Sequence, residues 1–325
     1  DIRQGKKKTR IPMVLCGLVH FARSASRIPR AAPLRHLQSK LSRNFSQSFD
    51  GEAATLFQSF FQNGAPAWAE TVSAVRRVNA SPSTIIDIAS GPGEPACSLS
   101  EAFPTSSVIC SDSSPDMVEM ARTRSEQLGR SNMTFSVDNM NDLSTYGDGT
   151  KDIVTAQFGL MFSPDLSIAL SEIHRVLKPE GHLVATVWQE FDLFPLIKET
   201  MTEILGKPPP APPINPMSLA DPDPLDAALA AAGFEIAEGH REVKDITFNM
   251  GPSTDEKAYK ACLIPVLPKL KEMQEESEEN EDFIAKALGI LKIVAAKQIS
   301  KQGDLQLSGV YRYVVVKKPG NQARR

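Results

Sequence analysis

The chain has 325 residues, of which 41% are hydrophobic and 23% charged, and its formal net charge is −3. This composition is typical of a globular protein, and the length allows one large α/β domain with additions at its ends. No apolar run is long enough to span a membrane. The four cysteines lack the C-x-x-C spacing of a zinc site or of a redox pair, so neither a metal centre nor a disulfide framework is predicted; they are Cys16, Cys97, Cys110 and Cys262.

Positive charge is concentrated in the first fifty residues. Residues 2–49 hold eleven Lys or Arg and no Asp or Glu, so residues 50–325 carry 25 basic and 38 acidic side chains. An acidic body is a poor match for nucleic-acid phosphates, and no nucleic-acid partner is expected. The N-terminal stretch is rich in Arg and Ser, with leucines at helical spacing, which is typical of an organellar transit peptide. We expect residues 1–48 to be a presequence for mitochondrial import; a plastid signal and a disordered cytoplasmic tail are the alternatives.

The segment from Asp87 to Pro95 carries the strongest local pattern. It follows the apolar run 84–86, which predicts a buried parallel strand. Gly91 and Gly93 let the chain turn sharply and bring bare backbone close to a ligand, and a proline suits the first turn of the following helix. A strand, a glycine turn and a helix predict a nucleotide-type cofactor site at the carboxyl end of a sheet.

Residues 91–96 also fit the dinucleotide fingerprint G-x-G-x-x-A, with Asp112 at about the expected distance of twenty residues. A nicotinamide-dependent oxidoreductase is therefore an alternative. Two details favour another cofactor. Asp87 occupies the end of the strand, where dinucleotide-binding strands are usually apolar, and Pro92 stiffens the turn between the glycines.

Further strands are predicted in order along the chain. The second, 108–112, ends in Asp112, and Ser114 is a candidate N-cap for the next helix. The third strand ends at Asp138. The fourth covers 152–158, and the fifth covers 183–188 after the helix end and turn at 173–181 (IHRVLKPEG).

Together these patterns resemble class I S-adenosylmethionine (SAM) methyltransferases, over roughly residues 84–190. The D-x-A-x-G-x-G motif starting at Asp87, the acid at position 112 and the "RVLKPxG" element carry the resemblance. It is closest in character to the broad "type 11" group and more generally to its ubiquinone–menaquinone branch. The implied fold is α/β, a doubly wound, seven-stranded Rossmann-like sheet whose last strand is antiparallel and inserts between strands five and six.

The resemblance also implies roles for site residues. Glycines of the turn allow backbone contact with the methionine half of SAM, and Asp87 orients the turn and the ligand's ammonium. Asp112 accepts hydrogen bonds from the ribose hydroxyls, Met117 packs on the adenine face, and Asp138 accepts from the adenine amine. The full set of predicted cofactor-binding residues is Asp87, Ala89, Gly91, Gly93, Asp112, Ser113, Met117, Asp138, Asn139, Met140, Gln157 and Phe158, the last two beside the methyl group.

The rest of the chain is expected to complete one methyltransferase domain over residues 49–320, with its core at 84–190. Residues 49–77 predict a helical cap. Residues 191–233, interrupted by the proline-rich connector 207–213, resemble the family's lid insertion between strands five and six, the predicted acceptor-binding segment. Strand six is predicted within 234–248 and the last strand at 307–316. Residues 321–325 form a tail.

The predicted activity is methyl transfer from SAM, with S-adenosylhomocysteine as product, to a small organic acceptor, lipophilic compounds included. The transfer is an in-line displacement, so the protein mainly aligns the acceptor and excludes water. No general base is assigned to the three histidines of the body (His174, His182 and His240), no catalytic residue is named, and the oligomeric state stays open. A non-catalytic, SAM-binding organellar assembly factor is the second hypothesis.

Overall fold

A computed structural model describes residues 62–211, 215–236, 241–277 and 281–320. The predicted presequence, residues 49–61 of the predicted cap, His240 and the tail 321–325 lie outside the described residues. The remainder of the cap is helix α3 (Ala65–Val78), which carries a proline in its first turn.

One mixed sheet of eight strands runs through the molecule, in the order β3-β2-β1-β4-β5-β8-β6, with β7 also paired to β8. Strands β1 to β5 are parallel, and β8 is antiparallel between β5 and β6, as predicted for the last strand. The bounds are β1 (Thr84–Ile88), β2 (Ser107–Asp112), β3 (Met133–Val137), β4 (Lys151–Gln157), β5 (Leu177–Phe191), β6 (Glu235–Ile236), β7 (Val243–Pro252) and β8 (Asp304–Lys317). The doubly wound α/β fold class is therefore confirmed.

The sheet differs from the prediction in having eight strands. The single strand expected within 234–248 is divided into two. Strand β6 pairs with the end of β8 at Val316 and Lys317, and β7 pairs with β8 from Asp304 to Arg312. Because β8 is 14 residues long, its outer edge accommodates two consecutive partners. Strand β5 is also longer than expected and already starts within the RVLKPEG pattern.

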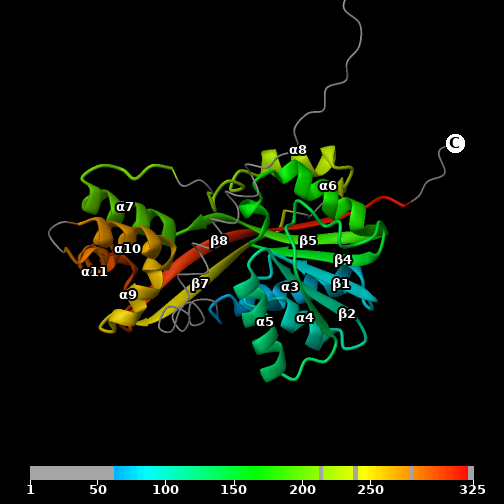
Figure 1. The fold of residues 1–325 in the computed structure, drawn as a ribbon, viewed down its shortest axis with the longest axis horizontal. Helices are drawn as coiled ribbons and strands as arrows, with labels where there is room; N and C mark the ends of the chain where they lie inside the picture. Colours follow the sequence, from blue (N-terminus) through cyan, green and yellow to red (C-terminus); the bar gives the residue numbers. More distant parts are fainter. Residues whose placement is uncertain (1–61, 212–214, 237–240, 278–280, 321–325) are drawn as a thin grey trace, which may run out of the picture.

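Helices cover both faces of the sheet (Figure 1). Helices α3, α4 (Ala96–Ala102) and α5 (Pro115–Gln127) lie on one face, and α6 (Leu166–Val176) and α8 (Pro222–Ala231) lie on the other. The predicted N-cap Ser114 accepts a hydrogen bond from the Met117 N–H. Helix α8 begins with a proline, and the preceding Asp221 side chain accepts the capping hydrogen bond from the Asp223 N–H.

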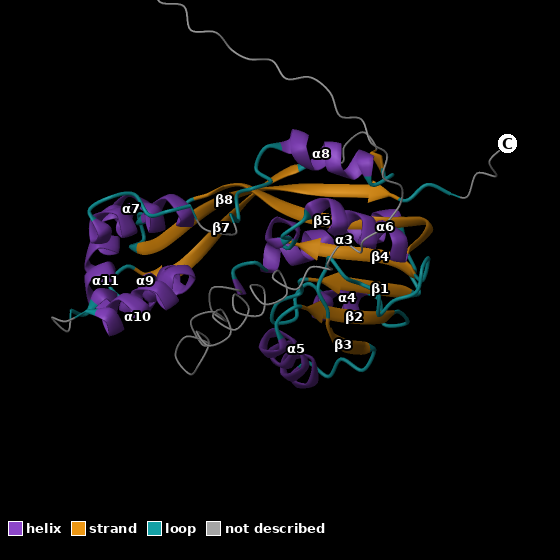
Figure 2. Ribbon diagram, turned by 45° about the horizontal axis from the view of Figure 1, so that its top comes forward, coloured by secondary structure: helices purple, strands orange, loops and turns teal. Residues whose placement is uncertain are grey.

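A second group of helices lies away from the sheet core, at the far end of the extended β7 and β8 (Figures 1 and 2). It contains α7 (Leu193–Leu205), α9 (Glu256–Leu263), α10 (Leu267–Glu276) and α11 (Phe283–Val294), and α11 packs against α7. The structure thus divides the predicted insertion 191–233 between two places. Helix α7 joins this distal group, whereas α8 packs on α6 beside the sheet.

Buried apolar side chains from all central strands form the core between the layers. Ile85, Val154, Leu183 and Val314 are completely buried. The three described cysteines, Cys97, Cys110 and Cys262, are buried free thiols. Burial of this apolar surface is the main favourable contribution to folding, and it holds the carboxyl ends of the parallel strands in fixed positions.

Candidate functional site

The turn after β1 is held by a buried carboxylate. Asp87 is 0% exposed, and its two oxygens accept hydrogen bonds from the Ser90 hydroxyl at 2.6 Å and the Thr155 hydroxyl of β4 at 2.5 Å. Burial raises the pKa of Asp87 to about 7, against the opposing effect of these two hydroxyls. The residue therefore ties the turn to the sheet, as predicted. Its complete burial leaves no surface for direct contact with a ligand's ammonium.

The two glycines of the turn serve different purposes. Both have positive φ, +55° at Gly91 and +105° at Gly93. A Cβ at Gly93 would lie 3.1 Å from both Cα and Cβ of Ala121, so this glycine lets α5 pack against the turn. A Cβ at Gly91 would meet nothing within 4 Å. The backbone at Gly91 is therefore open to a ligand.

Two other residues near this turn have left-handed backbones without being glycine. They are Ala89, with φ 52°, and Phe158, with φ 51°, and they follow the neighbouring strands β1 and β4. Such conformations cost on the order of 1–3 kcal/mol each and concentrate at functional sites. A Cβ at Gly159 would lie 2.8 Å from the Cβ of Ala89, so the two strand ends are in close contact.

Asp112, at the end of β2, bridges two backbone segments. One carboxylate oxygen accepts from the Gly91 N–H and the other from the Ser114 N–H, both at 2.9 Å. Burial raises the pKa of Asp112, and the backbone N–H groups of Ser114, Gly91 and Ser113 oppose that shift. Each carboxylate oxygen accepts about two hydrogen bonds, so both retain capacity for another donor. This fits the two hydroxyls of a ribose beside the open Gly91 backbone.

Asp138, after β3, is joined to β2, since its N–H donates to the Asp112 carbonyl at 3.1 Å. Its carboxylate accepts from the hydroxyls of Thr145 at 2.8 Å and Tyr146 at 2.6 Å. These two donors were not predicted, because they lie in a loop with no distinctive motif. Asn139 shapes the intervening turn by accepting from the Asn141 N–H, and Met140 packs on the core.

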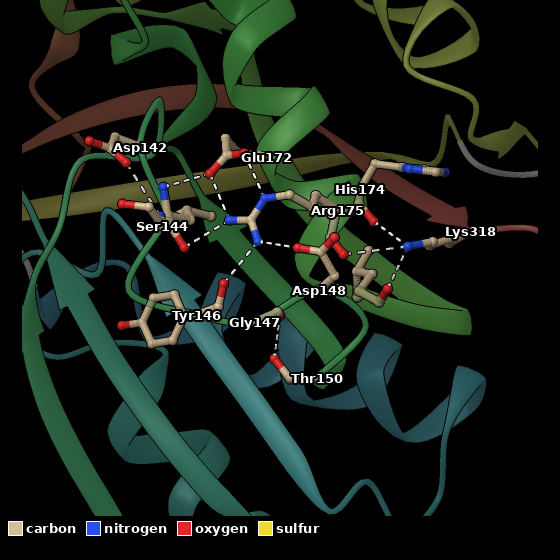
Figure 3. A network of polar contacts seen from close by, with 12 residues as sticks. Asp142, Ser144, Tyr146, Gly147, Asp148, Thr150, Glu172, His174, Arg175 and Lys318 are labelled. Atoms are coloured by element: carbon tan, nitrogen blue, oxygen red, sulfur yellow. Dashed lines mark hydrogen bonds and ion pairs between the residues drawn. The ribbon is translucent and has the colours of Figure 1, made fainter.

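The loop that supplies Thr145 and Tyr146 is fastened to helix α6 by Arg175 (Figure 3). The Arg175 guanidinium donates to the carbonyls of Leu143 and Tyr146 and to the carboxylates of Asp148 and Glu172, at 2.7–2.9 Å. Glu172 in turn accepts from the Leu143 N–H at 2.8 Å. We call this network the Arg175 clamp. Arg175 belongs to the RVLKPEG pattern, which gave the only sequence signal for it.

The predicted residues after β1, β2 and β3 are thus brought to one edge of the sheet. Met117 is 4% exposed at the start of α5, and Ser113 is exposed next to Asp112. The residues at the end of β4 make part of their contacts with elements away from this edge. Gln157 accepts from the Thr71 hydroxyl of α3 at 2.8 Å, and the Phe158 ring stacks on Trp188 with 4.0 Å between ring centroids.

The described histidines lie away from these strand ends. The His174 ring packs edge-on against Phe234, and His182 lies on β5 opposite Lys317. Burial lowers the pKa of both, so neither gains basicity from its surroundings. Within the described ranges there is no cluster of His, Cys, Asp and Glu that would hold a metal ion. Nor does any helix in those ranges combine the length and apolarity needed to cross a membrane.

Part of the chain is similar in sequence to known proteins. A family model described as a methyltransferase domain matches residues 86–185. The chain is 36% identical over 103 residues to a demethylmenaquinone methyltransferase of Thermus thermophilus, covering 32% of this chain and 46% of the relative. It is 36% identical over 107 residues to a ubiquinone/menaquinone biosynthesis C-methyltransferase of Rickettsia typhi, covering 31% and 43%. The chain thus spans less than half the length of these relatives.

A solved structure of a putative methyltransferase from Bacillus halodurans has 18% identity and a TM-score of 0.47, and the alignment covers 77% of this chain and 99% of that one. The sequence matches fall on the segment that contains Asp87, Asp112, Asp138 and the Arg175 clamp. Residues 86–185 therefore match a methyltransferase domain, and this segment is similar to the corresponding part of the menaquinone and ubiquinone methyltransferases.

Proposed function

We propose that this protein transfers a methyl group from SAM to a small organic acceptor. The observation that carries the proposal is the edge formed by the ends of β1, β2 and β3. There the open Gly91 backbone lies next to an Asp112 carboxylate that retains hydrogen-bonding capacity on both oxygens. Gly91 would hold the methionine half of the cofactor, Asp112 the ribose hydroxyls and Asp138 the adenine amine, by charge-assisted hydrogen bonds where carboxylates accept.

Bound SAM supplies a methyl group already activated on a sulfonium and ready for in-line displacement. The chain's own contribution is to bind, align and exclude water. At the end of β4, the rings of Phe158, Trp188 and Tyr311 form an apolar cluster, with Phe158 stacked on Trp188 and edge-on to Tyr311. Phe158 is the partly exposed member of this cluster, and its ring is the one that a flat, lipophilic acceptor could contact. Because the relatives above are named for menaquinone and ubiquinone methylation, a reduced quinone is the first acceptor to test.

Titration calorimetry of the full chain with SAM and S-adenosylhomocysteine tests the cofactor assignment. Asp112→Ala should weaken binding by about 100-fold, because two hydrogen bonds to a charged group are lost. Asp116→Ala is the matched control. Asp116 is exposed in the first turn of α5, four residues further on, and should bind as wild type does. Absence of binding in the wild type, or equal binding by Asp112→Ala, would contradict the proposal.

Transfer itself is measured with methyl-labelled SAM and demethylmenaquinol. We expect label in the quinol and none with Asp112→Ala at a cofactor concentration below the mutant's dissociation constant. Cofactor binding without transfer to any phenol or quinol would reduce the proposal to SAM binding alone.

A further inference from the structure

Arg312, in the middle of β8, is the largest of the fully buried side chains, with 1% exposure. Its Nη2 donates to the Leu219 carbonyl at 3.3 Å. Its Nε and Nη1 are buried without a hydrogen-bond partner. Among the described residues, no carboxylate lies within ion-pair distance of the guanidinium. Arg312 is thus a buried cation with only one hydrogen bond.

The charged side chains around Arg312 do not supply the missing acceptors. Three acids at the start of α8 (Asp221, Asp223 and Asp226) act on Arg312 from a distance. Arg241 forms ion pairs with two of them, Asp223 and Asp226. Burial lowers the pKa of Arg312, and these acids only oppose that shift. Burying a charge without pairing it is strongly unfavourable, so a fold that retains one is expected to complete it with another group.

The register of the sheet places Arg312 level with the end of β4, from which it is separated by β5. Arg312 pairs with Val187 of β5, one residue beyond Thr186, and Thr186 pairs with Gln157 at the end of β4. Successive side chains on a strand point to opposite faces. Tyr313 points toward α3, where its hydroxyl donates to the Ala67 carbonyl at 3.0 Å, so Arg312 points to the other face.

On that face, the turn at 217–220 covers Arg312 and is itself held by a second short segment. Leu219, the one partner of Arg312, belongs to the turn at 217–220 that precedes α8. Ser218 in this turn donates to the Met161 carbonyl at 3.5 Å. Met161 lies in the short helix η1 (Leu160–Phe162), which directly follows Phe158 at the end of β4. The cover is therefore attached to the same strand end where the acceptor is proposed to bind.

We infer that Arg312 binds an oxyanion of the methyl acceptor, a phenolate, enolate or carboxylate oxygen, once the turn at 217–220 moves aside. The inference rests on the proposed function and narrows its substrate class. A planar guanidinium with two unused donor nitrogens matches an oxyanion better than it matches a neutral group. An acceptor that presents its ionised oxygen to Arg312 has its ring held beside the end of β4.

Anion probes test this with the full chain by calorimetry, with and without saturating S-adenosylhomocysteine. The probes are benzoate, 4-nitrophenolate and, as the neutral control, benzamide. At least one anion should bind the wild type, with benzamide at least about tenfold weaker. Arg312→Met should lose about 30-fold in affinity for that anion, since a hydrogen-bonded charge is removed. Preference for benzoate or for 4-nitrophenolate then identifies the class of oxyanion. Arg241→Met, a neighbouring arginine paired at the surface, should retain the wild-type affinity.

Equal binding of benzamide and both anions, or unchanged anion binding by Arg312→Met, would overturn the inference. A measurement of cofactor binding distinguishes failure of this inference from failure of the proposed function. If S-adenosylhomocysteine fails to bind the wild type, the proposed function fails, while the titrations without cofactor still judge Arg312.

The melting temperature supplies a second readout. Without ligand, Arg312→Met should melt at or above the wild-type temperature, because an uncompensated buried charge is replaced by a flexible apolar side chain. If Arg312 had only a structural role, its loss would lower the melting temperature. Arg312→Lys, which keeps the charge but not the planar fork, should fold and bind the anion with intermediate affinity.

Discussion

Two arginines on different sides of β5 show opposite solutions to the burial of a charge. Arg175, at the end of α6, has two carboxylates and two carbonyls as partners. Arg312, in β8, is almost completely buried and has one carbonyl. The first arrangement is complete within the protein itself. The hydrogen bonding of Arg312 is complete only if a group outside the described residues supplies a hydrogen-bond acceptor.

The difference indicates what each region is for. The Arg175 clamp holds the loop that carries the partners of Asp138, and it needs no ligand to be stable. A buried polar network with every member satisfied fixes one conformation, whereas an unsatisfied charge stores free energy that a ligand can recover. The adenine end of the proposed site is therefore preformed, and the acceptor end is where binding energy is gained.

Asp87 gives the sharpest test of this comparison, because it is a fully buried carboxyl group with hydroxyl partners and no cation paired to it among the described residues. Its pKa is raised from 3.8 to about 7, so between about pH 4 and pH 7 the folded state holds a proton that the unfolded state has lost. The stabilisation from this group is fully present below about pH 4, decreases between about pH 4 and pH 7 and is lost above pH 7. The loss is at most roughly 4 kcal/mol for a shift of this size.

Urea unfolding of wild type and Asp87→Asn at pH 5 and pH 8 measures the effect. The wild type should lose more free energy of unfolding than the variant between the two pH values, because the amide cannot ionise. Identical losses would show that Asp87 does not titrate in this range. Contributions from other titrating groups cancel in the difference between the two proteins.

Arg175→Met should give the next largest effect and the opposite sign to Arg312→Met. Removing the guanidinium leaves two carbonyls without their donor and Glu172 with the Leu143 N–H in place of a cation, which should lower the free energy of unfolding by about 3 kcal/mol. Arg122→Met is the control. Arg122 is 46% exposed, forms an ion pair at 3.5 Å with Glu119 within one helix and lies 4.8 Å from the centroid of the Phe135 ring, so its loss should cost no more than about 1 kcal/mol. If Arg175→Met and Arg312→Met changed stability in the same direction, the comparison would fail.

The sequence allowed the strand-end residues of the site to be predicted because each depends on a local pattern. Asp87, Gly91 and Gly93 lie within residues 87–93 at one strand end, and Asp112 is the last residue of the next strand. The Arg175 clamp could not be read in this way. Its contacts join residues up to 32 positions apart, and only the folded loop brings them together.

Arg312 has a recognisable signal in the sequence. It is the single charge in the run Val310 to Val316, whose aromatic and β-branched residues predict a buried strand. A charge at such a position needs a partner, and this requirement marks Arg312 as a candidate site residue. The division of the edge into β6 and β7 was beyond local reasoning, because it depends on the length of β8, more than fifty residues away.

Tyr146→Phe should have the smallest effect on the free energy of unfolding, and it tests the loop that the Arg175 clamp holds. The hydroxyl donates to Asp138 at 2.6 Å, and burial together with that carboxylate raises the pKa of Tyr146, so the hydroxyl stays protonated and remains a donor. Its loss should lower the free energy of unfolding by about 1 kcal/mol, because Asp138 keeps the Thr145 hydroxyl. Calorimetry should show a modest loss of S-adenosylhomocysteine affinity, about three- to tenfold. A loss as large as that of Asp112→Ala would mean that Tyr146 itself contacts the cofactor, because orienting one carboxylate that has a second donor cannot account for so much binding energy.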